Sequence, residues 1–97
     1  YGFQPTRFAL FQNYPNPFNA STTLHYDLPE PSNVSISIFD ILGNEVIQLV
    51  KSDQHYGFKK IVWDGKNSQG ISVSPGVYFY KAELGQLTET KKMILVK

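Results

Sequence analysis

Two histidines, eight carboxylates and scattered serines are the residues of this 97-residue chain that could support hydrolysis or metal binding. His25 and Asp27 lie two positions apart in an alternating segment, so their side chains share one face. Ser21 or Ser35 could complete a Ser-His-Asp set, which requires all three groups to converge in a pocket. A solvent-facing histidine on a strand explains the same spacing, and we expect no catalytic residue here.

The other chemistry-bearing residues are also dispersed. His55 has no partner at a metal-ligand spacing, and the chain has no cysteine for a thiolate, zinc or iron–sulfur site. Residues 64–70 superficially resemble a calcium loop, but Lys66 and Ser68 stand where oxygen ligands are needed and no glutamate closes the loop. We therefore expect a protein that is not an enzyme, with no cofactor and no metal.

Aromatic side chains offer a different kind of site. Exposed rings on a sheet face can stack on sugars, which makes an accessory carbohydrate-binding module a rival function, although surface rings also occur in inert small domains. The candidates are Tyr14, Phe18, Phe39, Tyr56, Phe58, Tyr78, Phe79 and Tyr80.

Length and charge restrict the class of protein. Ninety-seven residues fit one small domain, and a net charge of +1 gives no basic excess for nucleic acid. The apolar runs are too short for a membrane-spanning helix, so we expect no membrane insertion. Three of the nine basic residues fall in residues 91–97, which contain no acid, so a basic tail follows a mildly acidic body.

Alternating apolar and polar residues predict about seven short strands and no helix. The expected strands are residues 8–11, 22–28, 34–39, 45–50, 58–63, 77–84 and 88–96, separated by turns rich in Gly, Pro and Asn. This pattern is typical of an all-β, Ig-like antiparallel β-sandwich. We expect residues 45–50 to be buried on both faces, Trp63 to be a core aromatic, and residues 1–7 to be a linker tail before a domain at 8–97.

Several motifs occur together in a fixed order. They are residues 10–19 (LFQNYPNPFN), 21–24 (STTL), 38–46 (IFDILGNEV), 63–65 (WDG), 74–80 (SPGVYFY) and 91–97 (KKMILVK). In order and spacing this set resembles the type A C-terminal sorting domain of the type IX secretion system, over roughly residues 8–97.

The resemblance implies a function that composition does not show. Such domains follow a linker at the C-terminus of secreted bacterial proteins and direct a larger cargo through the periplasm and across the outer membrane. The translocon recognises the domain, and an outer-membrane sortase-like peptidase usually removes it for cell-surface attachment. The cut is expected N-terminal to the sandwich, within residues 1–7 or upstream. The protein is then expected at the cell surface or in the extracellular space.

We expect the last strand to be the recognition surface, because an edge strand offers backbone groups for strand addition and its lysines add charge. The candidate residues are Lys91, Lys92, Met93, Ile94, Leu95, Val96 and Lys97. A second set is expected to shape turns: Asn13, Pro15, Asn16, Pro17, Phe18, Asn19, Asp40, Gly43 and Gly76. The alternatives are the carbohydrate-binding module and a structural spacer resembling the Ig-like domain of flagellar hook-capping proteins.

Overall fold

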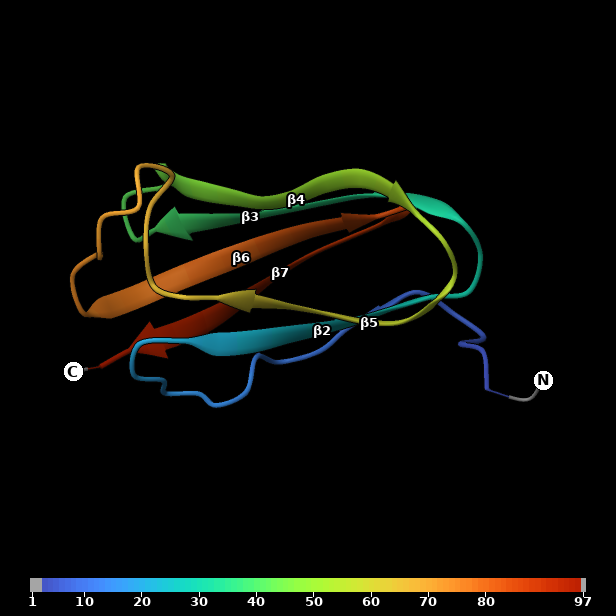
Figure 1. Ribbon diagram of the computed structural model, residues 1–97, viewed down its shortest axis with the longest axis horizontal. Coiled ribbons are helices and arrows are strands. Elements are labelled where there is room, and N and C mark those ends of the chain that lie inside the picture. Colours follow the sequence, from blue (N-terminus) through green and yellow to red (C-terminus); the bar gives the residue numbers. More distant parts are fainter. Residues whose placement is uncertain (1–2, 97) are drawn as a thin grey trace.

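The computed structural model describes residues 3–96, which form strands and no helix. Seven strands follow one another along the chain. Figure 1 labels β2 to β7. They are β1 (Ala9–Leu10), β2 (Thr22–Leu28), β3 (Ser32–Asp40), β4 (Glu45–Gln54), β5 (Gly57–Trp63), β6 (Gly76–Leu84) and β7 (Leu87–Leu95). The all-β prediction is confirmed.

Two antiparallel sheets stack face to face (Figure 1). Sheet A has the order β1-β2-β5 and sheet B has the order β4-β3-β6-β7. Because β3 pairs with both β4 and β6, sheet B places the last strand, β7, at one edge and β4 at the other.

The core lies between the sheets and follows the period-two pattern of the sequence. Apolar residues at alternate positions of β2, β3, β6 and the second half of β7 are buried, and most of their neighbours are exposed or partly buried. Trp63 is fully buried, with its ring 5.7 Å from that of Phe18 and 5.4 Å, edge-on, from that of Tyr78. The expectation of a core tryptophan is confirmed.

The expectation that residues 45–50 are buried on both faces is wrong. They belong to β4, an edge strand whose apolar residues are only partly buried. The pairing with β3 shifts twice, so that Leu49 and Val46 have no partner in the register. A bulge sets two residues of one strand against one of the other, which disrupts the alternation. The apolar doublets Val46-Ile47 and Leu49-Val50 coincide with these bulges and do not signal a central strand.

Residues 12–18 cross from one sheet to the other, and we call this segment the strap. Tyr14 forms an antiparallel bridge with Thr23 beside sheet A, and Phe18 forms a parallel bridge with Leu95 beside sheet B. The Tyr14-Pro15 and Asn16-Pro17 peptide bonds are both cis. The strap therefore closes one side of the sandwich, next to β7.

Candidate recognition surface at the C-terminal strand

Strand β7 begins after the two-residue turn Gly85-Gln86, which pairs Leu84 with Leu87. Gly85 has φ +61, a conformation that glycine adopts without strain. The turn fixes the register, so side chains of odd-numbered residues in β7 face the core and those of even-numbered residues face solvent.

This alternation divides the expected recognition residues between two faces. Met93 and Leu95 are buried in the core, whereas Lys92 and Val96 are exposed and Ile94 is partly buried. Lys91 is an inward position near the sheet edge, opposite Tyr80, and Lys97 lies outside the described residues. Met93 and Leu95 thus support the fold, and the outward side chains are the ones that a partner can touch.

The strap occupies the backbone edge of the second half of β7. The Phe18 amide donates to the Ile94 carbonyl over 2.9 Å, and the Val96 amide donates to the Phe18 carbonyl over 2.9 Å. Asn16 Oδ1 accepts from the Ile94 amide over 3.0 Å, and Gln12 Nε2 donates to the Lys92 carbonyl over 2.7 Å. The free backbone groups expected at this strand are therefore already paired between the Lys92 carbonyl and the Val96 amide, because strap residues fold over them.

A buried polar network holds the start of the strap. Asn13 is 2% exposed, and its backbone amide donates to the Tyr80 hydroxyl over 2.9 Å. That hydroxyl in turn donates to the Phe11 carbonyl over 2.8 Å. Asn13 Nδ2 donates to Thr22 Oγ1 over 3.0 Å, and Thr22 Oγ1 donates to the Pro15 carbonyl over 2.7 Å. Each of these buried polar groups is paired, so the strap keeps a defined path.

An aromatic anchor holds the end of the strap. Phe18 is 1% exposed and packs against Trp63, while Pro15, Pro17 and Asn19 are exposed. The strap therefore has a buried asparagine, Asn13, near its start and a buried ring, Phe18, at its end, with exposed prolines between them.

The remaining residues expected to shape turns lie at the end of sheet B where β7 ends, and they are Asp40, Gly43 and Gly76. Asp40 Oδ1 accepts hydrogen bonds of 2.9 Å from the amides of Leu42 and Asn44 and thereby caps the turn between β3 and β4. Gly43, in that turn, has φ +89 and open space around it. Gly76, at the start of β6, lies opposite Leu95 of β7.

Sequence reasoning missed Gln12, Thr22 and Tyr80, which complete the hydrogen bonds of the strap. Gln12 directly precedes the expected turn residues, which is a weak local signal. Tyr80 follows the strap by more than sixty residues, so no local pattern connects the two.

The residues considered for hydrolysis do not converge. His25 and Asp27 are neighbours on the outer face of sheet A, whereas Ser35 is on β3 in sheet B. Burial raises the pKa of Asp27, and the nearby His25 opposes that shift. Phe11 and Phe58 flank this pair in a surface hollow of about 520 Å³.

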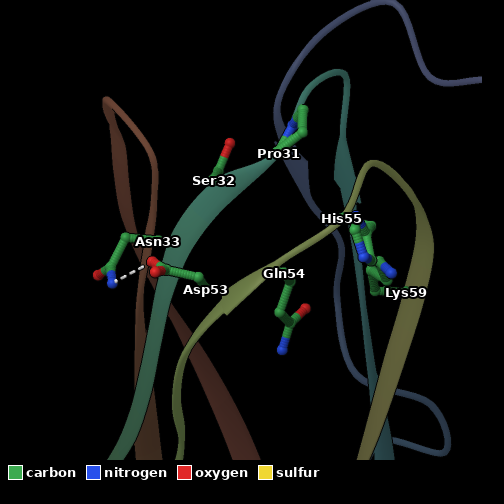
Figure 2. A pocket seen from close by; sticks show the side chains of 7 residues that line it. All are labelled: Pro31, Ser32, Asn33, Asp53, Gln54, His55 and Lys59. Carbon is green, nitrogen blue, oxygen red and sulfur yellow. Dashed lines mark hydrogen bonds between the residues drawn. The ribbon is translucent and has the colours of Figure 1, made fainter.

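A second hollow, of about 640 Å³, lies at one end of the sandwich (Figure 2). Asn33 and Asp53 point toward each other there, with Asn33 Nδ2 donating to Asp53 Oδ1 over 2.9 Å. Gln54 Oε1 accepts from the Tyr26 hydroxyl over 2.8 Å. These polar groups are paired with one another rather than aimed at a common point. In the part of the chain that the structure describes, no three His, Cys, Asp or Glu residues could hold a metal ion.

The expected aromatic candidates also separate by position. Phe18, Tyr78 and Tyr80 are buried in the core, and Phe39 and Phe79 are partly buried on the outer face of sheet B. Tyr14, Tyr56 and Phe58 are exposed. Residues 3–96 contain no helix able to cross a membrane.

The family model described as secretion system C-terminal sorting domain matches residues 12–97. No curated protein matches the chain. Among solved structures, the chain is similar to latent PorU from Porphyromonas gingivalis, with 27% identity and a TM-score of 0.76, covering 90% of this chain and 9% of that one.

Two further structures share the fold. PorZ of the P. gingivalis type IX secretion system has 17% identity and a TM-score of 0.61, covering 92% of this chain and 12% of that chain. FlgD from P. aeruginosa has 28% identity and a TM-score of 0.58, covering 76% of this chain and 57% of that one. The chain thus spans a small part of the two P. gingivalis proteins.

Proposed function

The chain belongs to the family of secretion system C-terminal sorting domains, and from this membership we propose a route by which it directs export. It is a C-terminal signal domain of the type IX secretion system. Membership implies an upstream cargo domain in the same protein, interaction with the secretion system, and secretion to the cell surface or extracellular space.

In our proposal the translocon recognises the folded domain and carries the attached cargo from the periplasm across the outer membrane. A sortase-like peptidase then cuts N-terminal to the sandwich, within residues 1–7 or upstream. The domain is a substrate of that peptidase and performs no catalysis itself. The observation that carries the proposal is the family match over residues 12–97, which includes both the strap and β7.

The structure supports recognition of the domain in its folded state. The strap and β7 are far apart in sequence, yet three backbone or side-chain donors and acceptors of the strap pair with Ile94 and Val96. A partner that binds where the strap and β7 pair can contact both segments only when the sandwich is folded. Within residues 91–96, the proposed recognition residues are the outward-facing Lys92, Ile94 and Val96. The proposed structural residues are the strap motif together with Asp40, Gly43 and Gly76.

The test is removal of residues 12–97 from the full-length protein in the bacterium that makes it. We expect cargo to disappear from the surface and extracellular fractions and to accumulate in the periplasm. A finer variant removes residues 93–97. Since Met93 and Leu95 are core residues, that truncation is paired with Lys92→Glu, which changes an exposed side chain. Continued export without residues 12–97 would refute the proposal.

The exposed aromatic residues favour carbohydrate binding as a second function. Tyr14, Phe58 and Phe11 are 77%, 65% and 46% exposed around sheet A, and rings in such positions can stack on sugars. The discriminating measurement is retention of the full-length protein on insoluble polysaccharide, compared with a Phe58→Ala variant. Equal retention of both proteins would argue against this second function.

A further inference from the structure

The outer face of sheet B carries four adjacent, partly buried apolar side chains near the end of β7. They are Phe39, Val77, Phe79 and Ile94, and we call them the sheet B patch. Phe39 lies opposite Phe79, and Val77 lies opposite Ile94. Their neighbours along each strand, such as Ile38, Tyr78 and Met93, fill the core, so the patch faces away from it.

Charges and exposed apolar residues border the patch. One row across the sheet reads Glu45, Phe39, Phe79 and Lys92, with the acid on β4 and the base on β7. The turn after β3 exposes Ile41 by 70% and Leu42 by 82%. One basic side chain, Lys92, thus borders the apolar centre on the β7 side, and one acidic side chain, Glu45, borders it on the β4 side. An apolar centre with a polar rim is typical of a protein interface.

Strand addition is blocked beside this patch. The outward backbone groups of β7 belong to even-numbered residues, and the strap already pairs with the Lys92 carbonyl, both groups of Ile94 and the Val96 amide. Within β7 itself, residues 87–95, the outward groups that lack a partner lie at Thr88, Thr90 and the Lys92 amide, toward the other end of the strand. A partner that binds at the C-terminal end of β7 must therefore contact side chains rather than add a strand.

We infer that the sheet B patch, with Lys92 at its rim, is the surface by which the secretion machinery binds this domain. The partner is a protein surface with apolar side chains opposite Phe79 and Ile94 and an acidic group opposite Lys92. The inference rests on the proposed function, and it replaces recognition by strand addition with recognition by side chains.

The test uses the double variant Phe79→Thr/Ile94→Thr in the full-length protein. Both side chains point outward, and threonine suits strands, so the fold should persist. The matched control is Phe58→Thr/Val62→Thr on the outer face of sheet A, where these side chains are 65% and 56% exposed. We expect export to fall about tenfold or more for the patch variant, as for loss of interface anchors, and to stay unchanged for the control.

A third variant tests strand addition directly. Thr90→Pro removes an outward backbone amide from the unpaired part of the β7 edge without removing a hydrogen bond to β6. We expect normal export. Loss of export by Thr90→Pro, with native Trp63 fluorescence, would overturn the inference in favour of strand addition.

The outcomes separate the inference from the proposed function. If removal of residues 12–97 blocks export while the patch variant is exported normally, the inference fails and the sorting function stands. If the removal has no effect on export, the sorting function fails as well. A patch variant that only converts a dimer of the purified protein to a monomer, with export unchanged, would assign the patch to self-association and also overturn the inference.

Discussion

Asn16 Oδ1 accepts a hydrogen bond of 3.0 Å from the backbone amide of Ile94, 78 residues further along the chain. A side-chain amide here takes the place that a neighbouring strand would otherwise fill. Edge strands invite pairing with other chains, and proteins cover them with loops or charges. This contact therefore both fixes the strap and protects the end of β7.

Asn16→Ala should release the Ile94 amide without disturbing the core. Because Asn16 is exposed and water can replace the lost partner, we expect the free energy of unfolding to fall by only ~0.5–1.5 kcal/mol. Hydrogen exchange at the Ile94 amide should accelerate more than at core amides of β6. The matched control is Asn33→Ala, which loses an exposed hydrogen bond to Asp53 on the far part of sheet B. Unchanged exchange at Ile94 would contradict the role of Asn16.

Phe18→Ala should destabilise the protein strongly, because the ring is 1% exposed and packs against Trp63. We expect a loss of ~3–5 kcal/mol in the free energy of unfolding, measured by urea titration with Trp63 fluorescence. Phe58→Ala, at a ring that is 65% exposed, should change stability by less than ~0.5 kcal/mol. Equal effects of the two substitutions would show that the strap is not anchored by Phe18.

Alkaline pH should weaken the fold through Tyr80. Burial raises the pKa of the Tyr80 hydroxyl to about 12, with the hydrogen bond from Asn13 opposing the shift and Glu89 adding to it. An ordinary tyrosine has a pKa of about 10, so the unfolded chain loses this proton first. The stabilisation is thus complete below about pH 10 and is lost as the pH rises through about 12.

The measurement is the free energy of unfolding between about pH 8 and pH 12, for wild type and Tyr80→Phe. The variant should be less stable at pH 8, because the Asn13 amide and the Phe11 carbonyl lose their partner. It should also decline less steeply with pH. Burial raises the pKa of Tyr26 and Tyr78 as well, so some decline remains. Parallel pH profiles would exclude Tyr80 as the source.

Gly65→Ala should cost more than Gly43→Ala, although both glycines have positive φ. A Cβ on Gly65 would lie 2.8 Å from the Ala20 carbonyl oxygen, a backbone atom that can yield only if the chain shifts, whereas a Cβ on Gly43 would have open space around it. We expect the Gly65 variant to lose at least ~1 kcal/mol more than the Gly43 variant, as for overpacking. Thermal unfolding of both proteins checks this, and equal midpoints would show that the Ala20 segment yields.

Alternation in the sequence was sufficient to predict most of the strands. In the central parts of β2, β3 and β6 apolar residues recur at every second position, because one face of each strand lies on a shared core. The same rule was misleading at β4, since its two bulges place apolar residues side by side in an edge strand. Periodicity carries no information on which residues of a strand lack a partner.

The sequence by itself determined the fold class, the turns and the family, because these depend on local pattern and on the order of motifs. Only the tertiary structure decided which side chains of residues 91–96 a partner can touch. The register of the β6–β7 hairpin buries Met93 and Leu95, and the strap covers the edge at Ile94. Both outcomes depend on contacts between segments far apart in the chain, and no local pattern records such contacts.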